Sequence, residues 1–229
     1  MSKRVVALAV AVGGISLACE ILHLPFWETN AVEVAVLAAL IVAAAVDLRR
    51  AVVPPAVSLP LLAGGAARTA VAFNLPGLVI LALALKDLRP GSRALENGIH
   101  GLLILASLGV ATLTGSEAPL LVSLLWLLAY RMWRRHWMGG GDAKLLMALV
   151  GLYPYPSTVV GMALGWLVVG LVWTARLYRR AFLPALFHAM AVAAAPPRIT
   201  REDLERRGVP MAGGIAVGFA VYLASRLLL

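Results

Sequence analysis

Long apolar runs dominate the chain, and short polar or basic stretches separate them. The apolar residues in these runs are continuous, whereas the strands of a membrane barrel alternate apolar and polar residues. A helix that crosses the hydrocarbon of a bilayer needs about 20 apolar residues. Nine runs are candidate spans: residues 5–24, 31–48, 56–73, 75–85, 98–113, 119–133, 143–153, 157–177 and 209–228. Two of them, 75–85 and 143–153, are short, so we expect partial spans that neighbouring helices support.

The composition agrees with this pattern. Hydrophobic residues make up 62% of the 229 positions and charged residues only 14%, whereas soluble domains carry about 25% charged residues. In lipid, only helices and closed barrels satisfy the backbone. The sequence therefore predicts an all-α, polytopic bundle of six to nine transmembrane helices. We expect one membrane-embedded domain over residues 1–229, with a short cytoplasmic segment at about 178–208.

The net charge of +9 comes from basic residues in small clusters between the apolar runs. If the N-terminus is cytoplasmic, all these clusters fall on one side, as the positive-inside rule requires, and the uncharged or acidic turns fall on the other. The clusters are Lys3-Arg4, Arg49-Arg50 and residues 86–93, 131–135, 176–180 and 198–207. This distribution predicts a multi-pass protein of the plasma membrane that contacts lipids and does not bind nucleic acid.

Two acidic residues occupy positions suited to chemistry. Asp47 ends an apolar run just before Arg49 and Arg50, and Asp142 begins another run after three glycines. The predicted topology places both at the cytoplasmic membrane boundary, on different helices. Carboxylates in such places are costly and are functional candidates by default. We therefore predict that Asp47 and Asp142 form the catalytic pair of an aspartic protease with its active site facing the cytoplasm.

The local settings of the two aspartates differ. Asp47 closes a predicted helix, where the negative end of the helix dipole disfavours its charged form. Asp142 opens a helix, where the positive end favours the charged form, and Lys144 follows two residues later. A shared proton would then make the ionised carboxylate a base and its neighbour an acid. This reasoning favours Asp142 as the base and Asp47 as the acid, with Lys144 either tuning Asp142 or extending its amine towards the membrane surface.

The three glycines before Asp142 are also predicted to belong to the site. Gly139, Gly140 and Gly141 lack side chains, so a second backbone can approach closely. A substrate peptide must lie extended beside the aspartates, which gives these glycines a role in binding or supporting it. The glycine spacing does not match a phosphate-binding loop.

Three strings resemble the type IV prepilin peptidase family of aspartic membrane proteases. Residues 138–146 (MGGGDAKLL) are similar to the motif in which Gly, any residue, Gly and Asp follow each other. Residues 47–55 (DLRRAVVPP) are similar to the family's first-aspartate motif, and residues 209–218 (VPMAGGIAVG) resemble its last helix. The resemblance implies Asp47 and Asp142 as the catalytic aspartates, no required metal or cofactor, and precursors of pilins or archaellins as partners. The single cysteine and the short cytoplasmic loops look like the archaeal enzymes of this family.

Two other functions remain open. One is a protease of the presenilin or signal-peptide-peptidase type, although Val46 stands where a tyrosine is expected. The other is a proton-coupled transporter, which would place its carboxylates near the middle of the membrane and often has repeated halves. The four histidines lack the spacing of metal ligands. Four aromatic residues are expected to mark the membrane interface: Trp126, Tyr130, Trp133 and Trp137.

Overall fold

The structure is a computed structural model that describes residues 2–50, 52–73, 93–135, 137–177 and 211–228. These residues form eight α-helices and one short 3-10 helix, and none of them lies in a strand. The elements are α1 (Lys3–Ile21), η1 (Phe26–Glu28), α2 (Asn30–Arg50), α3 (Pro55–Phe73), α5 (Arg93–Thr114), α6 (Ala118–Arg134), α7 (Gly140–Leu152), α8 (Pro156–Leu177) and α11 (Met211–Leu228). The all-α prediction is confirmed.

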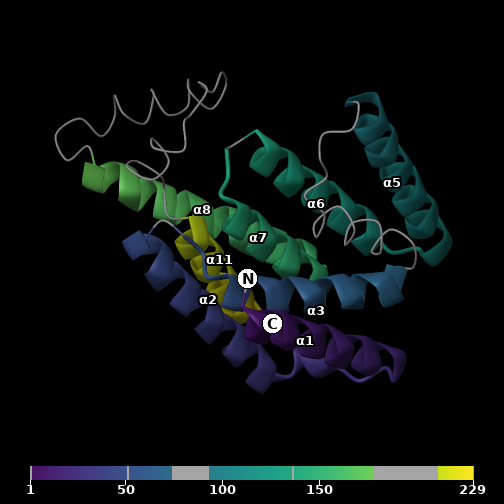
Figure 1. Cartoon of the computed structure of the whole chain (residues 1–229), viewed down its shortest axis with the longest axis horizontal. Helices are drawn as coiled ribbons and strands as arrows, with labels where there is room; N and C mark the ends of the chain where they lie inside the picture. Colours follow the sequence, from purple (N-terminus) through teal and green to yellow (C-terminus); the bar gives the residue numbers. More distant parts are fainter. Residues whose placement is uncertain (1, 51, 74–92, 136, 178–210, 229) are drawn as a thin grey trace.

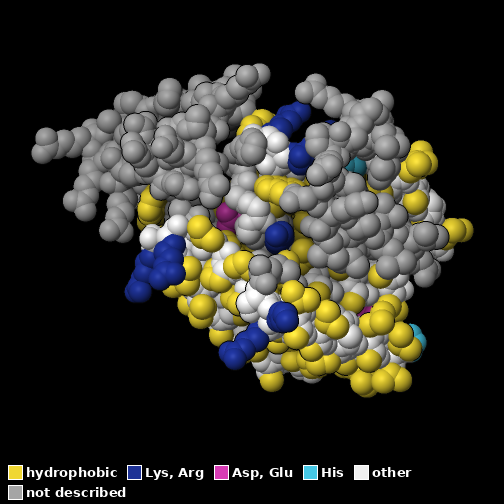
Figure 2. Space-filling model, viewed as in Figure 1, with side chains coloured by type: hydrophobic (Ala, Val, Ile, Leu, Met, Phe, Trp, Pro, Cys, Tyr) yellow, Lys and Arg dark blue, Asp and Glu magenta, His cyan; other side chains and the backbone are white. Residues whose placement is uncertain are grey.

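Three of these helices are long and apolar enough to cross a membrane: Lys3–Ile21, Asn30–Arg50 and Pro156–Trp173. Two shorter apolar stretches accompany them, His100–Thr114 and Met211–Leu227. Large apolar side chains cover much of the outer surface, and Val10 on α1 is 70% exposed. Figure 2 shows this mainly hydrophobic surface, on which lysine and arginine side chains gather in separate clusters. The chain is a helical membrane bundle whose outer surface suits lipid.

Eight of the nine predicted spans coincide with a described helix. The ninth, 75–85, and the predicted cytoplasmic segment at about 178–208 lie outside the described residues. The short predicted span at 143–153 corresponds to α7, whose 13 residues extend only about 20 Å. Almost every side chain of α7 is buried, so this helix lies inside the bundle rather than spanning the lipid.

The helices pack as a series of neighbouring pairs, and α7 lies in the middle of the bundle (Figure 1). Helix α1 lies along α3, and α3 packs against α7. On another side, α8 and α11 form the most extensive helix pair, and α11 also packs on α2. Helices α5 and α6 form a hairpin away from α1 and α2, and α6 joins it to the bundle through α7.

Glycines allow the tightest crossings. A Cβ atom at Gly65 of α3 would lie 2.6 Å from the carbonyl oxygen of Ala148 in α7. One at Gly165 of α8 would lie 2.3 Å from the backbone nitrogen of Gly218 in α11. Real side chains do not fit at such distances, so these backbones meet directly, as small residues permit in membrane helices. The positions of α7 and α11 are therefore fixed by backbone contact.

The predicted interfacial aromatic residues divide into two groups. Trp137 is 39% exposed, but Trp126 and Tyr130 are buried. Tyr130 packs edge-on against His100 and Trp133, with ring centroids 5.5 Å and 6.0 Å away. The interfacial prediction is wrong for Trp126 and Tyr130, because the helix pairing turns that face of α6 inward.

Candidate functional site

One end of the bundle gathers the termini of four helices. Helix α2 ends there, and α3, α7 and α11 begin there. Asp47 lies in the last turn of α2 and Asp142 in the first turn of α7. Helix direction therefore brings two aspartates that are far apart in sequence to the same end of the molecule.

Asp47 and Asp142 are equally buried, each with 8% of its surface exposed. They lie close enough to interact electrostatically, and both lie near the backbone of Ala212 in the first turn of α11. Within the described chain, Asp47 Oδ2 and Asp142 Oδ1 are shielded and have no hydrogen-bond partner. The two carboxyl groups therefore lie together beside the first turn of α11.

Basic side chains do not neutralise this pair. Arg49 and Arg50 follow Asp47 directly, but both are exposed while Asp47 is buried. Lys144 is half-buried one turn into α7. Among the described residues, neither aspartate forms a salt bridge with Lys144 or with an arginine.

Each glycine before Asp142 lies against another part of the protein. A Cβ at Gly139 would be 2.7 Å from Asp142 Oδ2, one at Gly140 would be 2.9 Å from Trp133 Nε1, and one at Gly141 would be 2.5 Å from the Cβ of Val53. The glycines therefore make room for the protein itself, which differs from the reason predicted from sequence. Gly139 is nevertheless exposed on its other side.

The contact between Gly141 and Val53 joins the two aspartate motifs. Val53 is buried and lies in the short connection between α2 and α3, six residues after Asp47. Any side chain at position 141 would push this connection away. The third glycine of the triplet therefore sets the spacing between the segment that carries Asp47 and the segment that carries Asp142.

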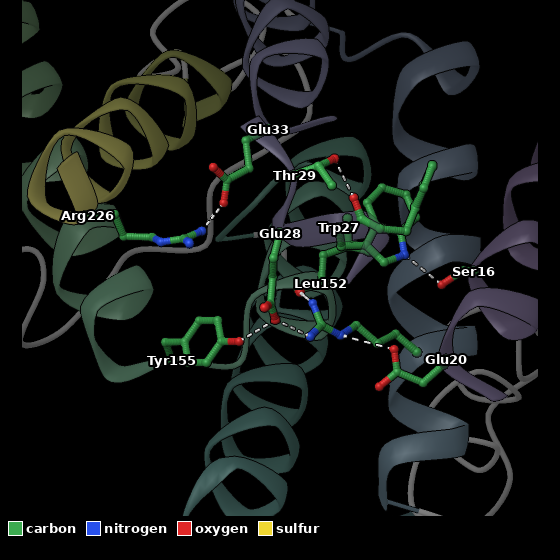
Figure 3. A network of polar contacts seen from close by, with 11 residues as sticks. Ser16, Glu20, Trp27, Glu28, Thr29, Glu33, Leu152, Tyr155 and Arg226 are labelled. Atoms are coloured by element: carbon green, nitrogen blue, oxygen red, sulfur yellow. Dashed lines mark hydrogen bonds and ion pairs between the residues drawn. The ribbon is translucent and has the colours of Figure 1, made fainter. Parts of the chain in front are cut away.

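The opposite end of the bundle holds a polar cluster centred on Arg68 of α3 (Figure 3). Its guanidinium lies 2.8 Å from Glu28 and 3.6 Å from Glu20, and it also donates to the backbone carbonyl of Leu152. The hydroxyl of Tyr155 donates to the same Glu28 oxygen at 2.6 Å. Four segments, α1, η1, α3 and the turn between α7 and α8, are thus tied together through one arginine.

These contacts shift the pKa values of Glu28 and Tyr155. The hydrogen bonds from Tyr155 and Arg68 lower the pKa of Glu28 below its ordinary value. Burial, together with the bond to the Glu28 carboxylate, raises the pKa of Tyr155 to about 12. At neutral pH the glutamate is charged and the tyrosine is a neutral donor, so the cluster is stable in this form.

A second arginine forms an ion pair at the same end. Arg226 in the last turn of α11 donates to the buried carboxylate of Glu33 at the start of α2. Sequence reasoning missed both arginine clusters. The signal was present, because Arg68 and Arg226 interrupt apolar runs and charged residues there need partners.

An apolar cavity of about 250 Å³ lies among α1, α2 and α3, and it includes Ile15, Val36 and Leu61 in its lining. Neither aspartate lines it. In the described part of the chain, no three His, Cys, Asp or Glu side chains are grouped so that they could hold a metal ion.

The fold and the site define a class of protein, a membrane-embedded helical bundle with two buried carboxylates at one end. The sequence identifies the family within this class. The profile of the Type IV leader peptidase family matches residues 34–175. This is more than half of the 229 residues, and the chain belongs to that family of peptidases. The match includes Asp47 and Asp142 but leaves out α1 and α11. No curated protein and no solved structure matches the chain.

Proposed function

We propose that this protein is an aspartic endopeptidase that removes the leader peptide from prepilin-like or archaellin precursors, with Asp47 and Asp142 as its catalytic pair. The observation that carries the proposal is that these two buried carboxylates lie close to each other at one end of the bundle. Membership of the Type IV leader peptidase family supports the reaction.

The chemistry needs one charged and one protonated carboxyl group. The ionised aspartate takes a proton from a water molecule, and the protonated one donates a hydrogen bond to the carbonyl of the scissile peptide. Two adjacent carboxylates that lack a cation share one proton readily, because ionising both is unfavourable. The shielded oxygens Asp47 Oδ2 and Asp142 Oδ1 are the atoms over which we place this proton. The helix ends favour Asp142 as the base.

The positions of the aspartates near helix ends support a site at a membrane boundary. Asp47 is in the last turn of α2, beside the exposed Arg49 and Arg50. Basic clusters of this kind are typical of cytoplasmic boundaries, so we propose that cleavage occurs on the cytoplasmic side. Gly139 and Gly140 would support the extended leader beside Asp142, since Gly139 exposes backbone next to that carboxylate. We assign Lys144, on the same turn, a supporting role.

The same position argues against the alternatives. A transporter that uses the aspartates as a coupling site would hold them near the middle of the membrane, often on broken helices. Here both aspartates lie within one turn of a helix terminus. A presenilin-like protease remains distinguishable by its substrates, because it cuts within a transmembrane helix whereas a leader peptidase cuts just before one.

The test is cleavage of a precursor peptide with a basic leader and an apolar helix by the purified protein in lipid vesicles. Asp47→Asn and Asp142→Asn are each expected to lower the rate at least about a thousandfold, since a general acid or base contributes about 10²–10⁴. Mass analysis of the products gives the cleaved bond.

Glu20→Gln is the matched control, because it also replaces a partly buried carboxylate but lies at the other end of the bundle. It should cleave at nearly the wild-type rate. Substantial cleavage by either asparagine variant, or a cut within the apolar helix, would refute the proposal.

A further inference from the structure

We propose that Trp133 of α6 is a positioning residue for Asp142, because its indole ring holds the glycine that opens α7. The inference rests on the proposed function, since it concerns how one aspartate of the catalytic pair is kept in place. It also gives a task in catalysis to the α5–α6 hairpin, which joins the bundle through the contact of α6 with α7.

The first turn of α7 is built from residues that cannot fix it by themselves. Gly139 is the N-cap of α7, and a glycine has no side-chain oxygen that could bond the first turn. Gly140 and Gly141 are the first two residues of the helix, and Asp142 is the third. Glycine loses more conformational freedom on folding than any other residue. The position of the Asp142 carboxylate therefore depends on what other segments pack against these glycines.

Two segments pack against them from different directions. A Cβ at Gly140 would lie 2.9 Å from Nε1 of Trp133 and 3.5 Å from its Cδ1, so the edge of the indole rests directly on this backbone. A Cβ at Gly141 would lie 2.5 Å from the Cβ of Val53, in the connection after α2. Consecutive residues of a helix point about 100° apart. Trp133 and Val53 thus hold the turn before Asp142 on two sides.

Buried aromatic rings keep Trp133 in place. Trp133 is half-buried, and its ring packs edge-on against Tyr130, which in turn packs edge-on against His100 of α5. Tyr130 and His100 are only 5% and 3% exposed. Edge-on packing is a favoured arrangement of aromatic rings. A series of three rings therefore leads from α5 to the start of α7, and the position of the hairpin determines where Gly140 lies.

Trp133→Leu tests the inference, because leucine leaves a gap where the indole edge contacts Gly140. We expect the turnover number per folded molecule to fall by about 10- to 100-fold, since a displacement of about 1 Å at a catalytic group costs up to about 10² in rate. KM for the precursor peptide should stay within about twofold, because the indole holds the enzyme rather than the substrate. If Trp133→Leu does not fold, Trp133→Met fills more of the space with a flexible chain, and the same fall is expected.

Trp27→Leu is the matched control. The ring of Trp27 also covers a glycine, since a Cβ at Gly64 would lie 2.8 Å from it, but it lies at the Arg68 end of the bundle. This variant should be less stable than the wild type and keep the wild-type turnover number per folded molecule. In the Trp133 variant, a wild-type turnover number, or a rise in KM alone, would overturn the inference.

A second glycine substitution separates positioning from a general loss of packing. Gly140→Ala alone should slow cleavage, because its methyl group would lie 2.9 Å from Trp133 Nε1. In Trp133→Leu this atom is gone, so the methyl group fits and fills part of the gap. The double variant should therefore be no slower than Trp133→Leu. Effects that multiply in the double variant would contradict the proposed contact.

The aspartate variants keep the two questions apart. If Asp47→Asn or Asp142→Asn cleaves substantially, the proposed function fails, and the inference about Trp133 fails with it. If both asparagine variants are inactive while Trp133→Leu cleaves at the wild-type rate, only the role of Trp133 fails.

Discussion

The two ends of the bundle differ in whether their carboxylates are paired with a cation. At one end, Glu20 and Glu28 contact Arg68, and Glu33 contacts Arg226. At the other end, Asp47 and Asp142 lie close to each other and have no cation partner in the described chain. Along α2, Glu33 and Asp47 are separated by about 20 Å, so one helix contributes to both arrangements.

This difference indicates which carboxylates are structural. A carboxylate paired with an arginine has its charge compensated. A buried carboxylate without a cation is costly, and such costs are concentrated at functional sites, where a group must change its protonation. Within the described residues, the lack of a basic partner is therefore what distinguishes Asp47 and Asp142 from the glutamates at the other end.

Removing the arginine at the paired end should have the largest effect on stability. Arg68→Met leaves the carboxylate of Glu28 without its cation and breaks the bond to Leu152. We expect the free energy of unfolding to fall by on the order of 3 kcal/mol, as for a broken buried pair. Unfolding in mixed detergent micelles measures this change, while turnover per folded molecule should stay near the wild-type value.

Two further variants sharpen this result. Arg131→Met removes an exposed arginine of α6 and should change stability by less than about 0.5 kcal/mol. The double variant Arg68→Met, Glu28→Gln should lose less than the sum of its parts, because the remaining partner is no longer charged. A loss of turnover in folded Arg68→Met would contradict the separation of the two ends.

Adding one methyl group at the end of the bundle that holds the aspartates should have an intermediate effect. This effect is on activity rather than on stability. In Gly139→Ala the new Cβ would lie 2.7 Å from Asp142 Oδ2, so the carboxylate must move away. We expect turnover to fall by about 10- to 100-fold, since a displacement of about 1 Å costs up to 10² in rate. Gly109→Ala, where nothing lies within 4 Å of the new Cβ, should be neutral in a side-by-side cleavage assay.

The smallest effect is a dependence of stability on acid pH at the paired end. The pKa of Glu28 is lowered by its hydrogen bonds to Tyr155 and Arg68. The contribution is therefore complete above the unfolded-state pKa of about 4.3 and is lost as the pH falls through the lower folded-state pKa. Because Glu28 is about one-third exposed, we expect at most about 1 kcal/mol. The difference in unfolding free energy between wild type and Glu28→Gln should shrink as the pH falls below about 4.3, and a constant difference would contradict this origin.

The sequence predicted the helical class and the aspartates because both depend on local strings. Continuous apolar runs specify helices in lipid, and Asp47 and Asp142 stand out because carboxylates are rare there. The arginine clusters depend on which helices are neighbours, and no periodicity in the sequence shows that Arg68 meets Glu28 rather than lipid headgroups. Trp126 was misplaced for the same reason, since only the packing of α6 on α7 buries it.

The glycines illustrate a further limit. The string before Asp142 suggested space for a substrate, but Gly141 is required by Val53, a residue 88 positions earlier in the chain (141 − 53 = 88). Such contacts become visible only when helix ends are placed in space.

The Arg68 cluster also has a consequence for the synthesis and membrane insertion of the protein. Glu20 and Glu28 are synthesised before Arg68, so a nascent chain can offer this arginine an anionic partner as soon as α3 enters the bilayer. The carbonyl of Leu152 arrives 84 residues later. Glu33 is paired only 193 residues later, when α11 brings Arg226 into the bilayer. Insertion of α11 thus neutralises Glu33 at one end of this helix, while its other end reaches the aspartates.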